Sequence, residues 1–131
     1  MAKEKTAYVD GFVLVVPKKN VAKYRKMARD ASKVWMKHGA LAYKECMLDD
    51  AKPEFVTFFF PVMAKAKPSE TVWFSYIEYK SKTHRNQVNK KVMKEFDELY
   101  ADEMKDPDHM KNMPFDMKRL AYGGFKVVVS D

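Results

Sequence analysis

Residues 71–79, TVWFSYIEY, decide the fold, because this run of β-branched and aromatic side chains predicts the strongest strand of the sequence. Ser81 follows almost directly and is a residue type that caps helices. Beyond it, Val88, Val92 and Phe96 recur at four-residue steps, which is the spacing of an amphipathic helix. A strand therefore leads straight into a helix in the second half of the chain.

The first half of the chain has the same order. Residues Tyr8–Val16 predict a strand that ends at Pro17, and Asn20 is a candidate cap for the helix that follows. This helix ends at Gly39, and lysines occupy its opposite side, as a solvated face requires. Its apolar stripe consists of Val21, Tyr24, Met27, Ala28, Ala31, Val34, Trp35 and His38.

Two more strands complete the pattern, one at Leu41–Leu48 and one at Arg119–Val129. The proline-rich residues 51–70 predict an irregular insert, and residues 101–116 predict a loop. The resulting order βαββαβ predicts an α+β, ferredoxin-like fold with a four-stranded antiparallel sheet and two helices on one face. At 131 residues we expect a single domain, 1–131.

The second face of the sheet needs a cover. Tyr8, Phe12 and Leu14 share one side of the first strand, whereas Val9 and Val13 share the other, so both sides are apolar. We therefore expect a homodimer in which a second copy covers the open face.

Two adjacent glycines, Gly123 and Gly124, interrupt the last strand. Glycine in a strand marks a bulge or the close approach of another backbone or a ligand. Two interpretations stay open: a backbone of the partner subunit lies close to these glycines, or they shape the twist and register within one sheet.

Four segments of the chain together resemble the YbaA-like family of small bacterial proteins, a family of unknown function. They read YVDGFVLVVPKKN, HGALAYKECMLDD, ETVWFSYIEYKSKTHRNQVNKKVM and MPFDMKRLAYGGFKVVV. The resemblance implies a dimeric α/β barrel, in which two ferredoxin-like subunits put their open sheet faces together. It implies no established activity, and the stretch from Lys94 to Lys111 looks longer than in the family.

Composition indicates the cellular compartment of the protein. Cys46 is the single cysteine, so no intrachain disulfide can form and a reducing compartment is expected. Residues 1–10 are charged without an apolar leader segment, and the longest clean apolar run, 12–16, is far too short to cross a membrane. We expect a soluble, cytoplasmic protein with no membrane association.

The net charge of +7 raises an alternative function, an interaction module that binds nucleic acid or another protein through its basic helices. We expect no nucleic-acid partner, because amphipathicity already explains most basic residues as solvated helix faces. The sequence has no glycine-rich phosphate loop and no zinc or redox motif, and its histidines are far apart. We expect neither a cofactor nor a metal.

The favoured function is binding of a small aromatic or amphipathic molecule in a cavity on the open sheet face, and catalysis stays an open question. Carboxylates stand inside three strands, where β-propensity disfavours them. If they share the open face, they form an aromatic cavity with a few polar groups. The strand residues of this candidate site are Asp10, Tyr43, Glu45, Tyr76, Glu78, Tyr122 and Lys126. The alternative is that these acids pair with Lys or Arg at the dimer seam.

The beginning of the second helix adds His84, Arg85 and Asn89 to the candidate site. Free N–H groups at a helix N-terminus favour anions. His84 is the histidine placed to titrate near the mouth of such a cavity. The alternative is a surface histidine beside a capping turn.

Overall fold

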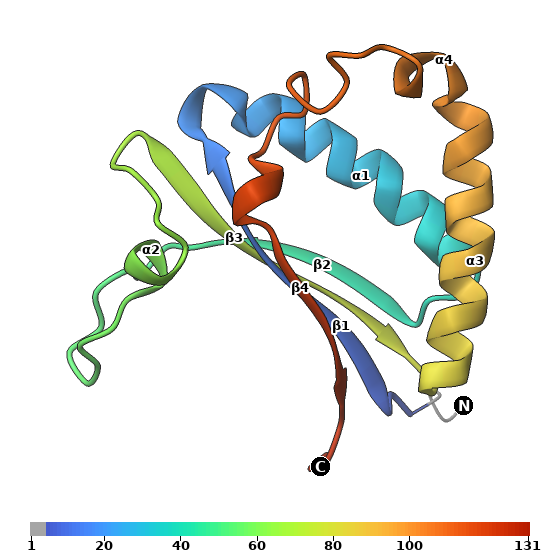
Figure 1. Ribbon diagram of the computed structural model, residues 1–131. Helices are drawn as coiled ribbons and strands as arrows, with labels where there is room; N and C mark the ends of the chain where they lie inside the picture. The colour runs from blue at the N-terminus through green and yellow to red at the C-terminus, as the bar shows by residue number, and fades with distance from the viewer. Residues whose placement is uncertain (1–4) are drawn as a thin grey trace.

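The computed structural model describes residues 5–131, which form a four-stranded antiparallel sheet with strand order β2-β3-β1-β4. Residues 1–4, part of the segment predicted to lack a leader, lie outside the described residues. Both long helices lie on the same face of the sheet, as Figure 1 shows. The predicted order and layering are thereby confirmed. The strands are β1 (Tyr8–Pro17), β2 (Ala42–Met47), β3 (Glu70–Tyr79) and β4 (Ala121–Lys126), and the long helices are α1 (Val21–Lys37) and α3 (Lys82–Leu99).

Within residues 5–131, four short helical segments accompany these elements. The 3-10 turn η1 (Lys18–Asn20) leads into α1, and η2 (Met117–Arg119) leads into β4. The predicted irregular insert contains α2 (Phe60–Met63), and the predicted loop after α3 contains α4 (Ala101–Met104). The insert extends away from α1 and α3, whereas the segment from α4 to η2 arches from the end of α3 back across α1 to the sheet (Figure 1).

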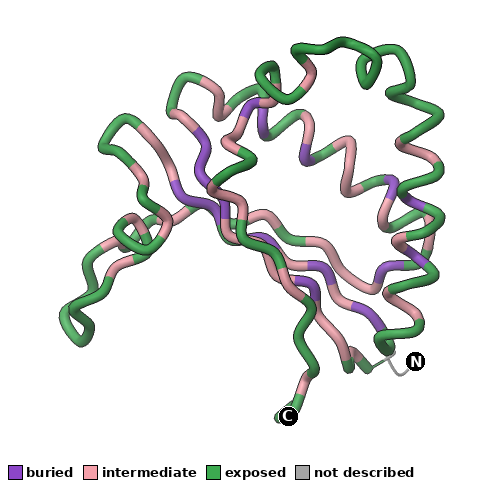
Figure 2. The backbone as a smooth tube through the Cα atoms, in the orientation of Figure 1, coloured by how far each residue is buried: buried purple, intermediate pink, exposed green. Residues whose placement is uncertain are grey.

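The core lies between the sheet and the two long helices (Figure 2). Alternation along β1 turns Leu14 and Val16 toward the helices, where they pack with Trp73 of β3 and with Tyr24 and Ala28 of α1. A second cluster joins α3 to the other end of the sheet; it consists of Val34, Ala40, Ile77, Tyr79, Val88 and Val92. Apolar residues at helical spacing on α1 and α3 therefore cover one face of the sheet.

The two long helices begin differently. The hydroxyl of Ser81 accepts the backbone N–H of His84 at 3.0 Å, so the predicted cap of α3 is confirmed. Asn20 makes no such capping bond to α1. Its side-chain amide instead donates to the carbonyl of Pro114 at 3.3 Å, which ties the chain after α4 to the start of α1.

The last strand is shorter than predicted. It ends at Lys126, and Val128 and Val129 beyond it are more than four-fifths exposed. Pairing explains the difference, because Tyr8 of β1 is the partner of Lys126. The partner strand β1 begins at Tyr8, so it offers no strand residues opposite 128–129.

A ring inside the same subunit occupies the space beside Gly124. A Cβ atom built at this position would lie 2.8 Å from Cε2 and 2.9 Å from Cζ of Tyr8. Gly123 pairs with Gly11, and the ring of Phe125 lies beside both. Within the subunit, the group that closely approaches Gly124 is thus the Tyr8 side chain.

Within residues 5–131, no helix combines the length and the apolar character that crossing a bilayer requires.

Candidate functional site

A cavity of about 420 Å³ lies between the sheet and the helices α1 and α3. Its lining is mostly apolar, and the segment that follows α3 supplies part of the wall. The aromatic lining includes Phe12, Trp35, Phe96, Tyr100 and Phe115. Four methionines, Met27, Met93, Met104 and Met113, also line it. Methionine side chains are flexible and polarisable, so this wall can adapt to the shape of a bound molecule.

Glu45 of β2 is the main polar group in this apolar lining. Its Oε1 accepts the hydroxyl of Tyr24 at 2.8 Å and also the hydroxyl of Ser75. Its Oε2 accepts the hydroxyl of Tyr43 at 2.6 Å. The three donors come from α1, β3 and β2, so the carboxylate is held in one position by three elements.

The two tyrosines beside Glu45 keep their protons. Burial is the main reason that the pKa of Tyr24 and that of Tyr43 lie far above the ordinary value. The negative charge of the Glu45 carboxylate raises both further. Both hydroxyls therefore act as donors to Glu45.

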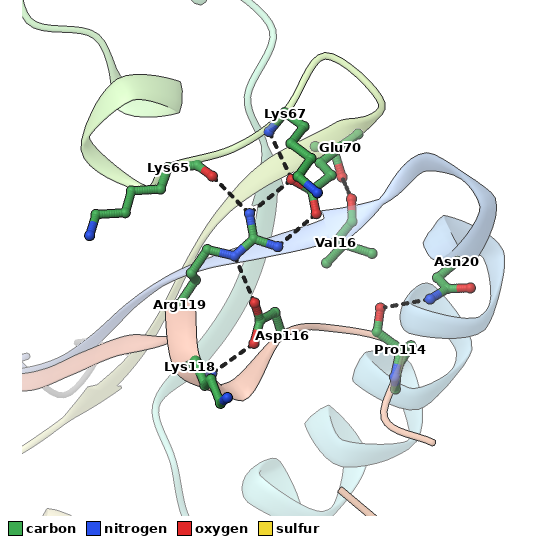
Figure 3. Close-up of polar contacts among 10 residues, drawn as sticks. Val16, Asn20, Lys65, Lys67, Glu70, Pro114, Asp116, Lys118 and Arg119 are labelled. Carbon is green, nitrogen blue, oxygen red and sulfur yellow. Dashed lines mark hydrogen bonds and ion pairs between the residues drawn. The ribbon is translucent and has the colours of Figure 1, made fainter. Parts of the chain in front are cut away.

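The wall made by residues 112–120 is fixed at both ends, as Figure 3 shows in part. At one end, Nζ of Lys23 donates to the carbonyl of Asn112 at 3.0 Å. At the other end, Arg119 makes two parallel bonds to Glu70, at 2.7 and 2.8 Å, and its Nε donates to Asp116 at 2.7 Å. Such paired arginine–carboxylate bonds are strong and directional. They hold Phe115 and Leu120 in place against the cavity.

A second polar cluster surrounds Asp10, which is 1% exposed. One oxygen of Asp10 lies 3.5 Å from Nη1 of Arg85, and the other accepts from Asn89 at 3.5 Å. The Asn89 carbonyl oxygen accepts from Trp35 at 3.2 Å and from Tyr79 at 3.1 Å. This cluster ties the first turns of α3 to the sheet and neutralises a carboxylate inside the core.

The structure brings four predicted site residues together in this cluster. Asp10, Arg85 and Asn89 meet as described, and the Tyr122 hydroxyl accepts from Arg85 at 2.7 Å. Lys126 lies on the same strand as Tyr122, paired with Tyr8 and exposed. Glu45 and Tyr43 form a separate group in the cavity wall.

The prediction that the three strand carboxylates share the open face is wrong. Asp10 contacts α3 and Glu45 contacts α1, so both lie on the face that the helices cover. Glu78 and Tyr76 lie on the opposite face, because Ile77 and Tyr79 alternate with them and belong to the core. There, Glu78 accepts from Thr6 at 2.9 Å. The cavity consequently lies on the helix side, not on the open side where the prediction placed it.

His84 is not among the residues that line the cavity in the described part of the chain. Its Nδ1 accepts the backbone N–H of Lys80 at 3.0 Å, and its ring packs edge-on against Tyr79. Burial is the largest cause that lowers the pKa of His84, followed by the charge of Lys80. His84 therefore lies in the capping turn at the start of α3.

Sequence reasoning missed Tyr24, Ser75, Trp35 and Tyr79, whose polar atoms hold the two clusters. Helical spacing places Tyr24 and Trp35 in the apolar stripe of the first helix. Because a buried tyrosine or tryptophan needs a partner for its polar atom, their presence in that stripe indicates a nearby acceptor in the sheet.

Taken with its layering, the sheet order β2-β3-β1-β4 defines a ferredoxin-like α+β protein. Residues 7–117 match the family described as "Protein of unknown function (DUF1428)", and the chain belongs to this family. It is 40% identical over 129 residues to the "Uncharacterized protein YbaA" of Escherichia coli, covering 95% of this chain and 98% of that protein. The protein of the same description from Shigella flexneri matches equally.

A solved structure shares the fold. It is the crystal structure of a dimeric ferredoxin-like protein from an uncultured marine organism, with a TM-score of 0.57 and 12% sequence identity. The similarity covers 96% of this chain and 98% of the other. The predicted family and fold class are thereby confirmed.

Proposed function

We propose that this protein is a homodimer that binds a small aromatic or amphipathic molecule in the cavity between the sheet and α1 and α3. The observation that carries the proposal is a cavity of about 420 Å³ with a mostly apolar lining and a carboxylate, Glu45, that neighbouring hydroxyls hold in place. Ligand sites have volumes of roughly 300–1,000 Å³ and combine apolar walls with a few placed polar groups. The site thus has the size and composition of a small-molecule site.

Fluorescence titration with phenylbutanol tests this function. Trp35 lines the cavity, so a bound aromatic alcohol should change its emission, and Trp35→Phe should remove that change. Ala31 also lines the cavity, and Ala31→Phe should fill it. Ala22→Phe is the matched control, because Ala22 is an exposed residue of the same helix.

The expected result is saturable binding that Ala31→Phe weakens by at least about tenfold and that Ala22→Phe leaves unchanged. Binding equally affected by both variants, or an emission change that persists in Trp35→Phe, contradicts this cavity as the site.

The proposed homodimer is supported by the face of the sheet that α1 and α3 leave open. Phe74 and Phe125 on this face are 47% and 61% exposed, and Val9 and Val13 lie between them on β1. Exposed apolar surface of this kind marks an interaction site. The structural relative with the same fold is described as dimeric, which supports a second copy as the occupant.

Light scattering tests the dimer at micromolar concentration. We expect about twice 15.3 kDa for the unaltered chain and a shift toward the monomer for Phe125→Asp. Leu99→Asp on α3, also at an exposed apolar residue, serves as the control and should remain dimeric. A monomeric unaltered chain, or equal effects of the two variants, contradicts assembly through the open face.

We also propose a cytoplasmic location, supported by the free, exposed thiol of Cys46, which suits a reducing compartment. Fractionation of the native host is the test. Recovery outside the cytoplasm would contradict it.

A further inference from the structure

The charged lining of the cavity has the opposite sign to the protein as a whole. The chain carries a net charge of +7. Among residues 5–131, the lining contains no lysine or arginine, and its acidic members are Glu45 and Asp97. His109 at the same cavity adds at most one positive charge against these two. The local charge therefore favours a cation over an anion.

Among residues 5–131, no basic side chain forms a direct ion pair with Glu45. Arg25 and Arg29 line a separate pocket of about 250 Å³ that Glu45 also borders. The contacts that the structure gives Glu45 are hydroxyl groups, which donate hydrogen bonds without supplying a positive charge.

Glu45 keeps capacity for one more donor. An ionised carboxylate has about four acceptor positions, two on each oxygen. Oε1 accepts two hydroxyls, from Tyr24 and Ser75, whereas Oε2 accepts one, from Tyr43. A ligand that donates a hydrogen bond can therefore complete the set at Oε2.

The donors beside Glu45 are already engaged, so an anionic ligand finds no comparable partner there. The hydroxyls of Tyr24, Tyr43 and Ser75 already donate to Glu45, and the indole N–H of Trp35 donates to Asn89. Next to Glu45, a carboxylate would have to break one of these bonds or remain without a donor, and both cost free energy in an apolar surrounding.

Aromatic rings in the lining of the same cavity add a second attraction for a cation. Trp35 packs against Tyr43 and Phe96, with ring centroids 5.8 and 5.4 Å away, and all three line the cavity. The faces of such rings attract ammonium groups. Rings and carboxylate thus favour the same chemical group.

We propose that the natural ligand of this cavity is an amphipathic amine, whose protonated nitrogen donates to Oε2 of Glu45 while its apolar part lies against the methionine and aromatic walls. This inference rests on the proposed function and specifies the chemical class of the ligand.

Three probes of matched shape test it by titration calorimetry: phenylbutylamine, phenylbutanol and phenylbutyrate. The unaltered protein should bind the amine about tenfold more tightly than the alcohol. Both can donate a hydrogen bond to the Glu45 carboxylate, but only the ammonium adds the attraction of opposite charges, which is strong in an apolar surrounding. It should bind the carboxylate least tightly. This ranking needs no variant, so it decides the question even if a substitution at Glu45 prevents folding.

Two variants test whether Glu45 is the group that causes the preference for the amine. Glu45→Gln should weaken the amine about tenfold while changing the alcohol less than about threefold. Asp97→Asn removes one charge from an exposed residue of the same cavity, where solvent screens it, and should change the amine less than about twofold.

The failures are distinguishable. If none of the three probes binds, the proposed function fails, and the inference fails with it. If the alcohol binds but the amine does not bind more tightly, or the carboxylate matches the amine, only the inference is overturned. An amine preference that survives Glu45→Gln also overturns it.

Discussion

Replacing Gly124 by alanine should destabilise the fold through a side chain on the neighbouring strand. The added Cβ atom would lie 2.8 Å from Cε2 of Tyr8 and 2.9 Å from its Cζ, distances that real Cβ contacts do not show. The Tyr8 ring cannot withdraw freely, because Arg85 lies over it at 5.1 Å and donates to its hydroxyl at 3.3 Å.

The magnitude follows from two opposing effects. Overpacking by an added methyl group costs typically about 1–3 kcal/mol. Replacing glycine by alanine also restricts the unfolded chain, which stabilises the fold by about 0.4–1 kcal/mol. We therefore expect Gly124→Ala to lower the free energy of unfolding by about 1–2 kcal/mol.

The adjacent glycine provides the matched control. A Cβ atom at Gly123 would lie 3.7 Å from the ring of Phe125, which is ordinary contact. Gly123→Ala should therefore leave the free energy of unfolding unchanged or raise it by up to about 1 kcal/mol. Urea denaturation at neutral pH, followed by far-UV circular dichroism, measures both variants.

A double-mutant cycle with Tyr8→Ala identifies the cause. In the Tyr8→Ala background the ring is gone, so Gly124→Ala should no longer destabilise the fold. Equal free energies of unfolding for Gly123→Ala and Gly124→Ala, or an unchanged effect of Gly124→Ala without the ring, would refute the reasoning.

Two further predictions concern electrostatics and capping. The hydrogen bonds from Arg119 hold the pKa of Glu70 at about 2, below its ordinary 4.5. The stability that Glu70 contributes is therefore present above about pH 4.5 and is lost as the pH falls toward 2, so Glu70→Gln should flatten the fall of unfolding free energy over this range; an equally steep fall speaks against the pair. Ser81→Ala removes the bond to the His84 N–H and should cost about 1 kcal/mol in thermal or urea denaturation, and no loss would contradict the cap.

Local signals were enough to predict the order of strands and helices. Apolar residues at four-residue steps after Ser81 gave α3, and alternating β-branched and aromatic residues gave β1 and β3. The start of α3 was also predictable, because a capping hydroxyl acts on its own next turn. These features depend on contacts between residues close in sequence.

The face of the sheet could not be predicted from the same signals. Both sides of β1 are apolar, with Phe12 and Leu14 on one and Val9 and Val13 on the other. Alternation fixes which residues share a face, but it does not say which face the helices cover. Asp10 was consequently placed on the open side, although its partners lie about 75–79 residues away on α3.

The candidate site was predictable only in part, for the same reason. Glu45 and Tyr43 stand two residues apart in one strand, so their common side followed from alternation. The other two donors to Glu45, Tyr24 and Ser75, come from elements that only the tertiary fold brings together. The methionines from α4 and the following segment depend equally on how the chain returns across α1.

The central claim, a ligand site between the sheet and the helices, is tested most directly by methyl NMR of the methionines during titration with phenylbutanol. Ten methionines are spread over the chain, and four of them line the cavity: Met27, Met93, Met104 and Met113. We expect saturable shifts at these four methyl groups, while the exposed Met36, Met47 and Met63 outside the lining stay in place. Shifts confined to the outer three, or no saturable shift at the four, would contradict the account.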